Sequence, residues 1–230
     1  MKMRSTLVAM AGLAAAASLA NAAVLWDQSA LDTSPTGQGL FHTISPGFNG
    51  SVVFGVSDVT VPAGGWMIQS FLTYYTSFNF SAGTSAVLNV FPKTGSVPIA
   101  VNDPRASPTG NGTSVPVTAT DFVVDFQGVR EYTASGLNIV LAPGDYWIGL
   151  TPVQPSGPFG ADFQWSTTAH SGNNQAAWSL DFGFREGWFD YGTLSGLAQH
   201  DGAIKIQGIP APGSLAVLGL GGLLAARRRR

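Results

Sequence analysis

The sequence predicts an all-β domain, a β-sandwich of jelly-roll-like type, and three observations carry this prediction. Between residues 23 and 209, no window of 11 residues holds a sustained 3.6-residue apolar pattern, which argues against amphipathic helices. Short alternating runs bounded by Gly, Pro, Asn and Asp recur instead, as in strands joined by tight turns. The 29 glycines, about twice the usual ~7% share, are then accounted for by turns.

The first predicted strands lie in residues 52–92. A strand is expected near residues 52–56. The next extended run is expected to place four apolar side chains on one face: Trp66, Ile68, Leu72 and Tyr74. The run after it repeats the alternation with three more: Ala86, Leu88 and Val90.

The middle of the domain predicts two hairpins. Phe122, Val124 and Phe126 alternate with Asp121, Val123 and Asp125. Gln127-Gly128 is expected to turn the chain into a strand over residues 129–135. A second hairpin is predicted over residues 137–151, with two sets of inward side chains: Leu137, Ile139 and Leu141, then Tyr146, Ile148 and Leu150. Pro143 and Gly144 supply the fixed and the positive φ that a type II turn needs.

Three further strands are predicted near residues 163–167, 176–182 and 203–207, which brings the total to about nine. Residues 32–39 and 103–116 are rich in Ser, Thr, Pro, Gly and Asn and are expected to be surface loops. No internal repeat of fixed period is present, which disfavours a solenoid or a propeller.

Charge and cysteine content exclude several classes of function. The chain has no cysteine, so disulfides and thiolate chemistry are excluded. Between residues 23 and 212, five cations face all 13 acidic residues, a net charge of −8. A body this acidic repels phosphate backbones, so we expect no nucleic-acid partner.

Residues 1–22 are predicted to be a secretory signal peptide with an apolar helix. Lys2 and Arg4 supply the basic start, an Ala- and Leu-rich stretch follows, and Ala20-Asn21-Ala22 supplies the small residues that signal peptidase requires. Cleavage is expected between Ala22 and Ala23, which makes residues 23–209 the exported domain.

The C-terminal end of the chain carries a second predicted targeting signal. Pro210, Ala211 and Pro212 precede 14 apolar or small residues (213–226), and Arg227, Arg228, Arg229 and Arg230 close the chain. Fourteen residues are fewer than the roughly 20 of a full membrane span, so a short hydrophobic helix with weak, transient insertion is expected. The arginines would stay on the cytoplasmic side.

This arrangement over residues 210–230 resembles the PEP-CTERM sorting signal of bacterial exported proteins, with Ala211 in place of the usual Glu. The resemblance implies an exosortase, an integral-membrane enzyme that cuts at the tripeptide and frees the protein. It also implies a place at the cell-envelope surface or in the extracellular matrix, in organisms that commonly make exopolysaccharide. A tail that remains as an anchor is the alternative. The aromatic runs around Trp66 and Trp147 also look like those of PEP-CTERM proteins of unknown activity.

No catalytic motif stands out in the domain. The G-x-S-x-G, H-E-x-x-H and P-loop patterns are absent, and His42, His170 and His200 lack zinc-site spacing. Carboxylates at Asp181, Glu186 and Asp190 could supply an acid and a base, but surface acids are the favoured interpretation. No cofactor is expected. A structural calcium ion is an open alternative because six aspartates lie at or near predicted turns: Asp58, Asp103, Asp121, Asp125, Asp145 and Asp201.

Residues 165–191 hold the densest group of aromatic side chains. Trp178 alternates with small or polar neighbours and is expected in the core, whereas residues 184–191 break the alternation and predict a loop. Trp188 and Tyr191 are therefore the candidates for sugar stacking. The expected function is a non-catalytic structural or adhesive protein associated with exopolysaccharide. A carbohydrate-binding module is the alternative, and a glycoside hydrolase or lyase comes third.

Overall fold

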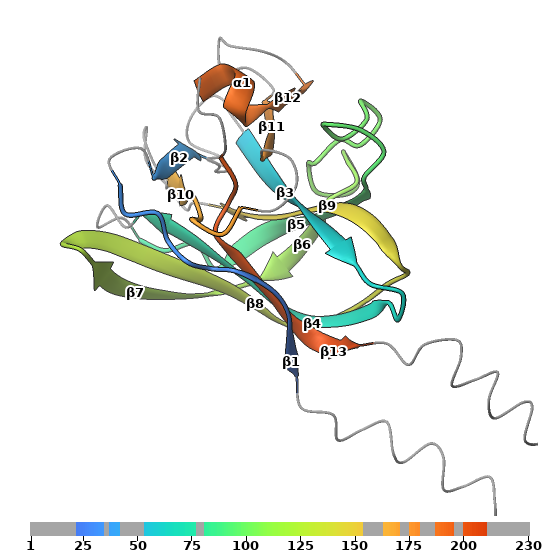
Figure 1. Cartoon of the computed structure of the whole chain (residues 1–230), viewed down its shortest axis with the longest axis horizontal. Helices are drawn as coiled ribbons and strands as arrows, with labels where there is room; N and C mark the ends of the chain where they lie inside the picture. The colour runs from blue at the N-terminus through green and yellow to red at the C-terminus, as the bar shows by residue number, and fades with distance from the viewer. Residues whose placement is uncertain are drawn as a thin grey trace, which may run out of the picture.

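The computed structural model describes residues 22–34, 37–41, 53–76, 81–153, 163–170, 175–179, 187–195 and 200–210. This part of the chain is built of strands that form two antiparallel sheets, with one short helix, α1 (Tyr191–Ser195) (Figure 1). The all-β prediction is confirmed.

The first sheet has seven strands. Its main path runs through β1 (Ala23–Gln28), β13 (Ile204–Pro210) and β4 (Trp66–Thr76), and β4 continues on its other side into β8 (Gln127–Leu141) and β7 (Thr118–Val124). The short strands β10 (Phe163–Trp165) and β2 (Gln38–Phe41) extend the sheet from β4 at Tyr75.

The second sheet has six strands in the order β12-β11-β3-β9-β5-β6. They are β12 (Gly187–Asp190), β11 (Ala176–Ser179), β3 (Val53–Val61), β9 (Gly144–Val153), β5 (Ser85–Pro92) and β6 (Thr113–Pro116). Helix α1 follows β12 directly.

The main core contains side chains from both sheets in one packed cluster. The six-stranded sheet supplies Val59, Leu88, Ile148 and Leu150, among others. The seven-stranded sheet supplies Ile68, Phe71, Tyr132, Ala134 and Ile206, among others. Burial of apolar surface on this scale is the main source of stability for a domain without disulfides.

Three of the predicted inward faces are confirmed. Ala86 and Leu88 of β5 are buried in the main core, with Val90 packed against it. The two sets predicted for β8 and β9 also belong to this core: Leu141, Ile148 and Leu150 are buried in it, and Leu137, Ile139 and Tyr146 pack against it. Gly144 has the expected positive φ, at 147°.

The predicted hairpin over residues 137–151 is wrong. Strand β8 pairs with β4 and β7, whereas β9 pairs with β3 and β5, so the chain crosses from one sheet to the other at Ala142-Pro143. An inward alternating face is the same whether the next strand lies beside the first or opposite it across the core. The alternation therefore predicted the buried face correctly and the partner strand incorrectly.

The predicted face of Trp66, Ile68, Leu72 and Tyr74 is also wrong in its second half. Residue pairing between β4 and β13 steps from Gln207↔Ser70 to Gly208↔Ile68, so Gln69 is an extra residue in β4. Such a bulge reverses the alternation. Phe71 and Tyr75 therefore join Trp66 and Ile68 in the main core, and Tyr74 packs in a separate cluster with Trp165.

The turn between β7 and β8 lies two residues earlier than predicted. Asp125 and Phe126 form it, with φ values of 47° and 67°, and Val124 pairs with Gln127 across it. Two successive positive φ angles are the requirement of a type I′ turn, whose twist matches that of the flanking strands.

Almost all of the predicted signal peptide (1–22) and of the predicted sorting segment (210–230), with the helices expected there, lies outside the described residues, which include only Ala22 and Pro210 of these segments. Within the described part of the chain, no helix has the length and apolar character needed to cross a membrane.

Candidate functional site

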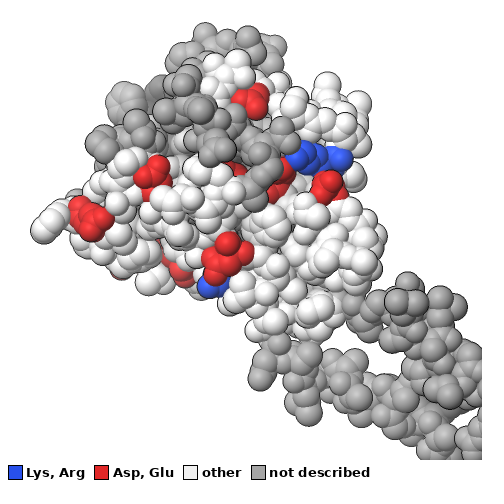
Figure 2. Space-filling view, viewed as in Figure 1, with Lys and Arg blue, Asp and Glu red and all other residues white. Residues whose placement is uncertain are grey.

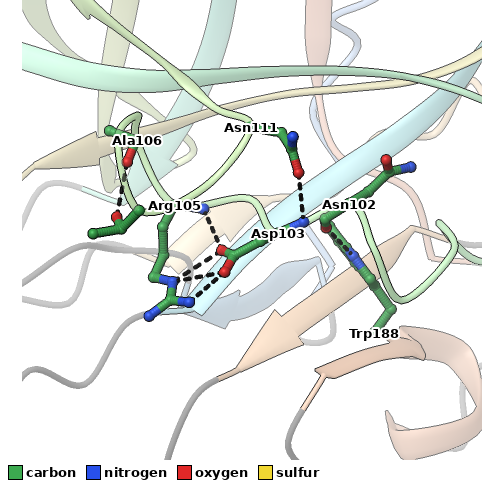
Figure 3. A network of polar contacts seen from close by, with 7 residues as sticks. Asn102, Asp103, Arg105, Ala106, Asn111 and Trp188 are labelled. Carbon is green, nitrogen blue, oxygen red and sulfur yellow. Dashed lines mark hydrogen bonds and ion pairs between the residues drawn. The ribbon is translucent and has the colours of Figure 1, made fainter.

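Trp188, one of the two predicted sugar-stacking residues, lies on β12 at the margin of an aromatic cluster. It pairs across the strands with Trp178 of β11 and packs edge-on against Phe91, with 5.9 Å between ring centroids. Its indole N–H donates to the backbone O of Asn102 at 2.7 Å (Figure 3). The side chain is half-buried, so part of it is available to a ligand.

The segment that holds Trp188 in place, residues 93–112, covers the outer face of the six-stranded sheet. Asp103 is its centre: the carboxylate accepts from Arg105 Nε at 2.9 Å, and the backbone N–H of Asp103 donates to Asn111 Oδ1 at 3.0 Å (Figure 3). Hydrogen bonding from the Arg105 side chain is the main reason that the pKa of Asp103 is lowered. This network gives the segment a defined shape.

Arg105 joins the network to the aromatic cluster. Its guanidinium lies 5.8 Å from the ring centroid of Trp178, and 40% of its side chain is exposed. Trp178 itself is buried, but it pairs across the strands with the half-buried Trp188. The Trp188 ring and the Arg105 guanidinium together offer a stacking surface and hydrogen-bond donors to a neutral polar ligand.

Tyr191, the other predicted stacking residue, is not exposed. It is the first residue of α1, only 7% exposed, and its ring centroid lies 4.2 Å from that of His200. The predicted exposure was wrong because the loop interpretation missed β12 and α1, whose turn directs Tyr191 into the domain. Asp190, at the junction, accepts from the N–H of Thr193 and fixes the start of the helix.

A buried polar cluster surrounds Asp201, which is 1% exposed. Its carboxylate accepts from the backbone N–H of Gly202 at 2.9 Å and is also hydrogen-bonded to Ser57. Burial raises the pKa of Asp201 to about 8 and lowers the pKa of the neighbouring His200 to about 4. Both groups are therefore largely neutral at pH 7.

Glutamine side chains continue this cluster through the interior. Gln28 Nε2 donates to the backbone O of Gly202 at 2.8 Å, Gln175 donates to Gln164, and Gln164 donates to Thr73 at 2.9 Å. These bonds tie β1, β4, β10 and β13 together near Asp201. Because the groups are enclosed, the cluster stabilises the arrangement of strands and offers no open face for a substrate.

The six aspartates considered for calcium lie in different settings. Asp58 contacts Lys93, Asp103 contacts Arg105, and Asp121 contacts Arg130. Asp145 accepts from the hydroxyl of Thr60 at 2.6 Å, Asp125 lies in the β7–β8 turn, and Asp201 is buried. Among the residues that the structure describes, no three acidic or histidine side chains gather into a possible metal site.

The remaining sequence candidates for chemistry do not come together in the described ranges. His170 is exposed and His200 is buried, while His42, Asp181 and Glu186 lie outside the described residues. On the face drawn in Figure 2, acidic side chains are scattered over a mostly uncharged surface, with Lys and Arg at only a few places.

The tip of the β7–β8 hairpin is a surface that the sequence analysis did not single out. Phe126 is fully exposed at 103%, Val123 is 70% exposed and Phe122 is 37% exposed. The available signal was that the apolar alternation of residues 122–126 continues into the turn itself. Exposed apolar groups gathered at one tip mark a surface for contact with another molecule.

The two predicted processing points lie close to one end of the domain. Strand β1 begins at Ala23, directly after the exposed Ala22, and β13 ends at Pro210. The two strands are antiparallel neighbours in which Ala23 pairs with Gly208 (Figure 1). Ala211, Pro212 and the four arginines lie outside the described residues.

No protein-family model, no curated protein and no solved structure matches this chain.

Proposed function

We propose that this chain is an exported bacterial protein whose domain, a jelly-roll-like β-sandwich, has a structural or adhesive and non-catalytic role at the cell-envelope surface or in the extracellular matrix. The observation that carries the proposal is the adjacency of the chain ends, since Ala23 pairs with Gly208. The domain thus spans from one predicted processing point to the other. Signal peptidase would act at Ala22 and an exosortase-type enzyme at Pro210-Ala211-Pro212.

The arrangement of strands supports a defined orientation during export. While residues 213–226 are in the inner membrane, the Ala23 and Pro210 end of the seven-stranded sheet faces the bilayer. Strand β8 runs from Gln127 beside the hairpin tip to Leu141, which pairs with Trp66, and Trp66 also pairs with Pro210. The hairpin tip therefore lies at the far end of the sheet and points away from the membrane.

This orientation supports the adhesive role. Phe126 and Val123 would be exposed apolar groups at the end of the sheet opposite the bilayer, where exopolysaccharide or another cell-surface component is within reach. Apolar side chains can contact the C–H faces of sugar rings. This contact does not depend on the net negative charge of the domain.

Sorting is tested by replacing Arg227, Arg228, Arg229 and Arg230 with glutamine in the full chain. Loss of the positive end should trap or mislocalise the protein, as measured by fractionation and surface labelling. Arg105→Gln is the matched control, because it removes a cation from the domain and leaves the tail intact. Unchanged surface display of the tail variant would refute the tail assignment.

A carbohydrate-binding module is the second candidate. The observation that favours it is the half-buried Trp188, whose cross-strand neighbour Trp178 lies next to Arg105. Binding of the full chain to a glycan array and to the host's matrix polysaccharide, with and without calcium, tests it. Trp188→Ala should abolish binding, while Phe126→Ser at the hairpin tip should leave it intact. Binding that is lost only in the Phe126 variant would instead locate the contact at the tip.

A further inference from the structure

A lysine and an aspartate are in direct contact on the outer face of the six-stranded sheet. Lys93 Nζ donates to Asp58 Oδ2, and only 17% and 8% of the two side chains are exposed. Asp58 of β3 and Phe91 of β5 both pair with Trp147 of β9, so the contact reaches across the central strand between them. Lys93 Nζ lies 5.1 Å from the ring centroid of Trp147, whose side chain is fully buried.

We propose that Lys93 and Asp58 become joined by an amide bond between Nζ and Cγ, an intramolecular cross-link that fastens β3 to the segment following β5. The class of reaction is condensation of an amine with a carboxylic acid. It needs no oxidant, no reductant and no second substrate.

The atoms and charges of this condensation balance within the pair. The ammonium transfers a proton to the carboxylate, the neutral nitrogen attacks Cγ, and one carboxyl oxygen leaves as water with two of the three ammonium protons. The third proton stays on the amide nitrogen. The positive and the negative charge both disappear, and this removes the desolvation cost that a poorly exposed ion pair carries.

Fixed proximity accelerates the condensation. Holding two reacting groups in contact raises their effective concentration far above that of free molecules in solution. The surroundings keep the pair in place, since Trp147, Phe91 and Val56 form one buried cluster on this face. The backbone N–H of Lys93 also donates to the O of Asp145 at 2.8 Å.

A second carboxylate, that of Asp145, lies in the next row of the sheet. Asp145 pairs with Thr60, two residues beyond Asp58 on β3. The hydroxyl of Thr60 donates to its Oδ1 at 2.6 Å. The backbone O of Asp145 also accepts the backbone N–H of Lys93, so Asp145 joins the Lys93 segment to β3. We assign Asp145 as a positioning residue, and removal of its carboxylate should slow formation of the bond.

The cross-link would give this chain a covalent bond between distant residues, which disulfides cannot supply here. The protein has no cysteine and therefore no disulfide. An amide between residues 58 and 93 closes a loop within the chain and lowers the entropy of the unfolded state in the way that a disulfide does. Unlike a disulfide, it does not depend on the redox state outside the cell.

The test is the intact mass of the denatured full chain, compared with that of the Lys93→Arg variant. Arginine keeps the positive charge beside Asp58, but its guanidinium does not deprotonate and forms no amide. The wild-type protein is expected to be lighter than its composition by one water molecule, and the variant should have its full mass. Because both proteins carry the same ends, removal of either terminal segment affects them equally.

Digestion with a protease that cuts after aromatic residues locates the bond. Phe71, Tyr74 and Tyr75 separate Asp58 from Lys93 in the chain, so the cross-link must appear as a branched pair of peptides. A branched pair distinguishes it from dehydration of a single aspartate. Asp58→Asn should retain the cross-link with loss of ammonia in place of water, and Asp145→Ala should delay it. A wild-type mass equal to its composition would overturn the proposal.

Discussion

The two sheets bury their outer faces to very different extents. In the six-stranded sheet, β3 is buried at every position except Thr60, because residues 93–112 cover its outer face and enclose Phe54, Trp147 and Trp178. In the seven-stranded sheet, β7 is exposed along most of its length, and Val140 on the outer face of β8 is 70% exposed. One sheet thus has two apolar faces and the other has one.

The difference in burial predicts which strands tolerate side-chain substitution. A strand that is buried on both faces loses packing wherever a side chain is truncated. A strand with one solvent-exposed face tolerates substitution at every second position. It also explains why the aromatic residues gather on the six-stranded sheet, where they fill the space under the covering segment.

The largest effect is expected for Trp147→Ala, which removes a fully buried side chain from the covered face. The free energy of unfolding should fall by about 3–5 kcal/mol, as for other buried large-to-Ala changes. Val140→Ala, on the open face of the other sheet, should change it by less than about 0.5 kcal/mol. Urea unfolding measures both, and similar losses for the two variants would contradict the difference between the sheets.

Gly149→Ala tests how closely β3 and β9 approach each other in the six-stranded sheet. An added Cβ would lie 1.9 Å from the backbone O of Gly55, so β3 and β9 must move apart. We expect a loss of about 1–3 kcal/mol, the usual cost of overpacking. Gly95→Ala is the control because its nearest atom, the O of Val97, is 3.7 Å away. Equal midpoints in chemical denaturation for these variants would show that the two strands are not closely packed.

The buried cluster of Asp201 and His200 predicts an unusual dependence of stability on pH. Between pH 3.8 and about 8, folded Asp201 keeps a proton that the unfolded chain has lost, so stability falls as pH rises. Between about pH 4 and 6.5, the unfolded chain holds a proton that folded His200 lacks, so stability rises with pH. The two slopes nearly cancel below pH 6.5.

Above pH 6.5 only Asp201 still acts, and stability should fall by about 1.4 kcal/mol per pH unit up to about pH 8. Thermal unfolding across this range measures the slope. Asp201→Asn should remove the decline and leave only the rise between about pH 4 and 6.5. A decline of the same steepness in the Asn variant would assign it to other groups.

The smallest effect is expected for Trp188→Phe, which removes the hydrogen bond to Asn102 and keeps an aromatic ring. The loss should be about 0.5–1.5 kcal/mol. Amide hydrogen exchange should locate it in residues 93–112. Thr109→Val, which removes an exposed bond to Ala106 in the same segment, should have a still smaller effect. If exchange in this segment is unchanged by Trp188→Phe, Trp188 does not hold the cover in place.

Alternation in the sequence predicted which side chains are buried more successfully than it predicted which strands are neighbours. The inward faces of β5, β8 and β9 were correct because burial is a local property of a pleated strand. The partner of β8 was not predictable in this way, since both strands face the same core. The bulge at Gln69 depends on a distant glycine: a Cβ on Gly208 would lie 2.1 Å from the O of Met67.

Only the locally determined part of the candidate site could be predicted from the sequence. The position of Trp178 in the core followed from alternation and is confirmed. The environments of Trp188 and Tyr191 depend on residues 93–112 and on His200, which are distant in sequence. The contact of Lys93 with Asp58 likewise needs the order β3-β9-β5, and this order is a result of tertiary pairing rather than of either local sequence.

The neighbouring chain ends and the distant hairpin tip make the domain mechanically anisotropic. A force that pulls Ala23 away from Pro210 peels β1 from β13 one hydrogen bond at a time. A force between Pro210 and Phe126 instead runs along β13, β4 and β8, perpendicular to their hydrogen bonds, so that many bonds bear the load together. A domain held at its tail and pulled at its tip is loaded in its strong direction.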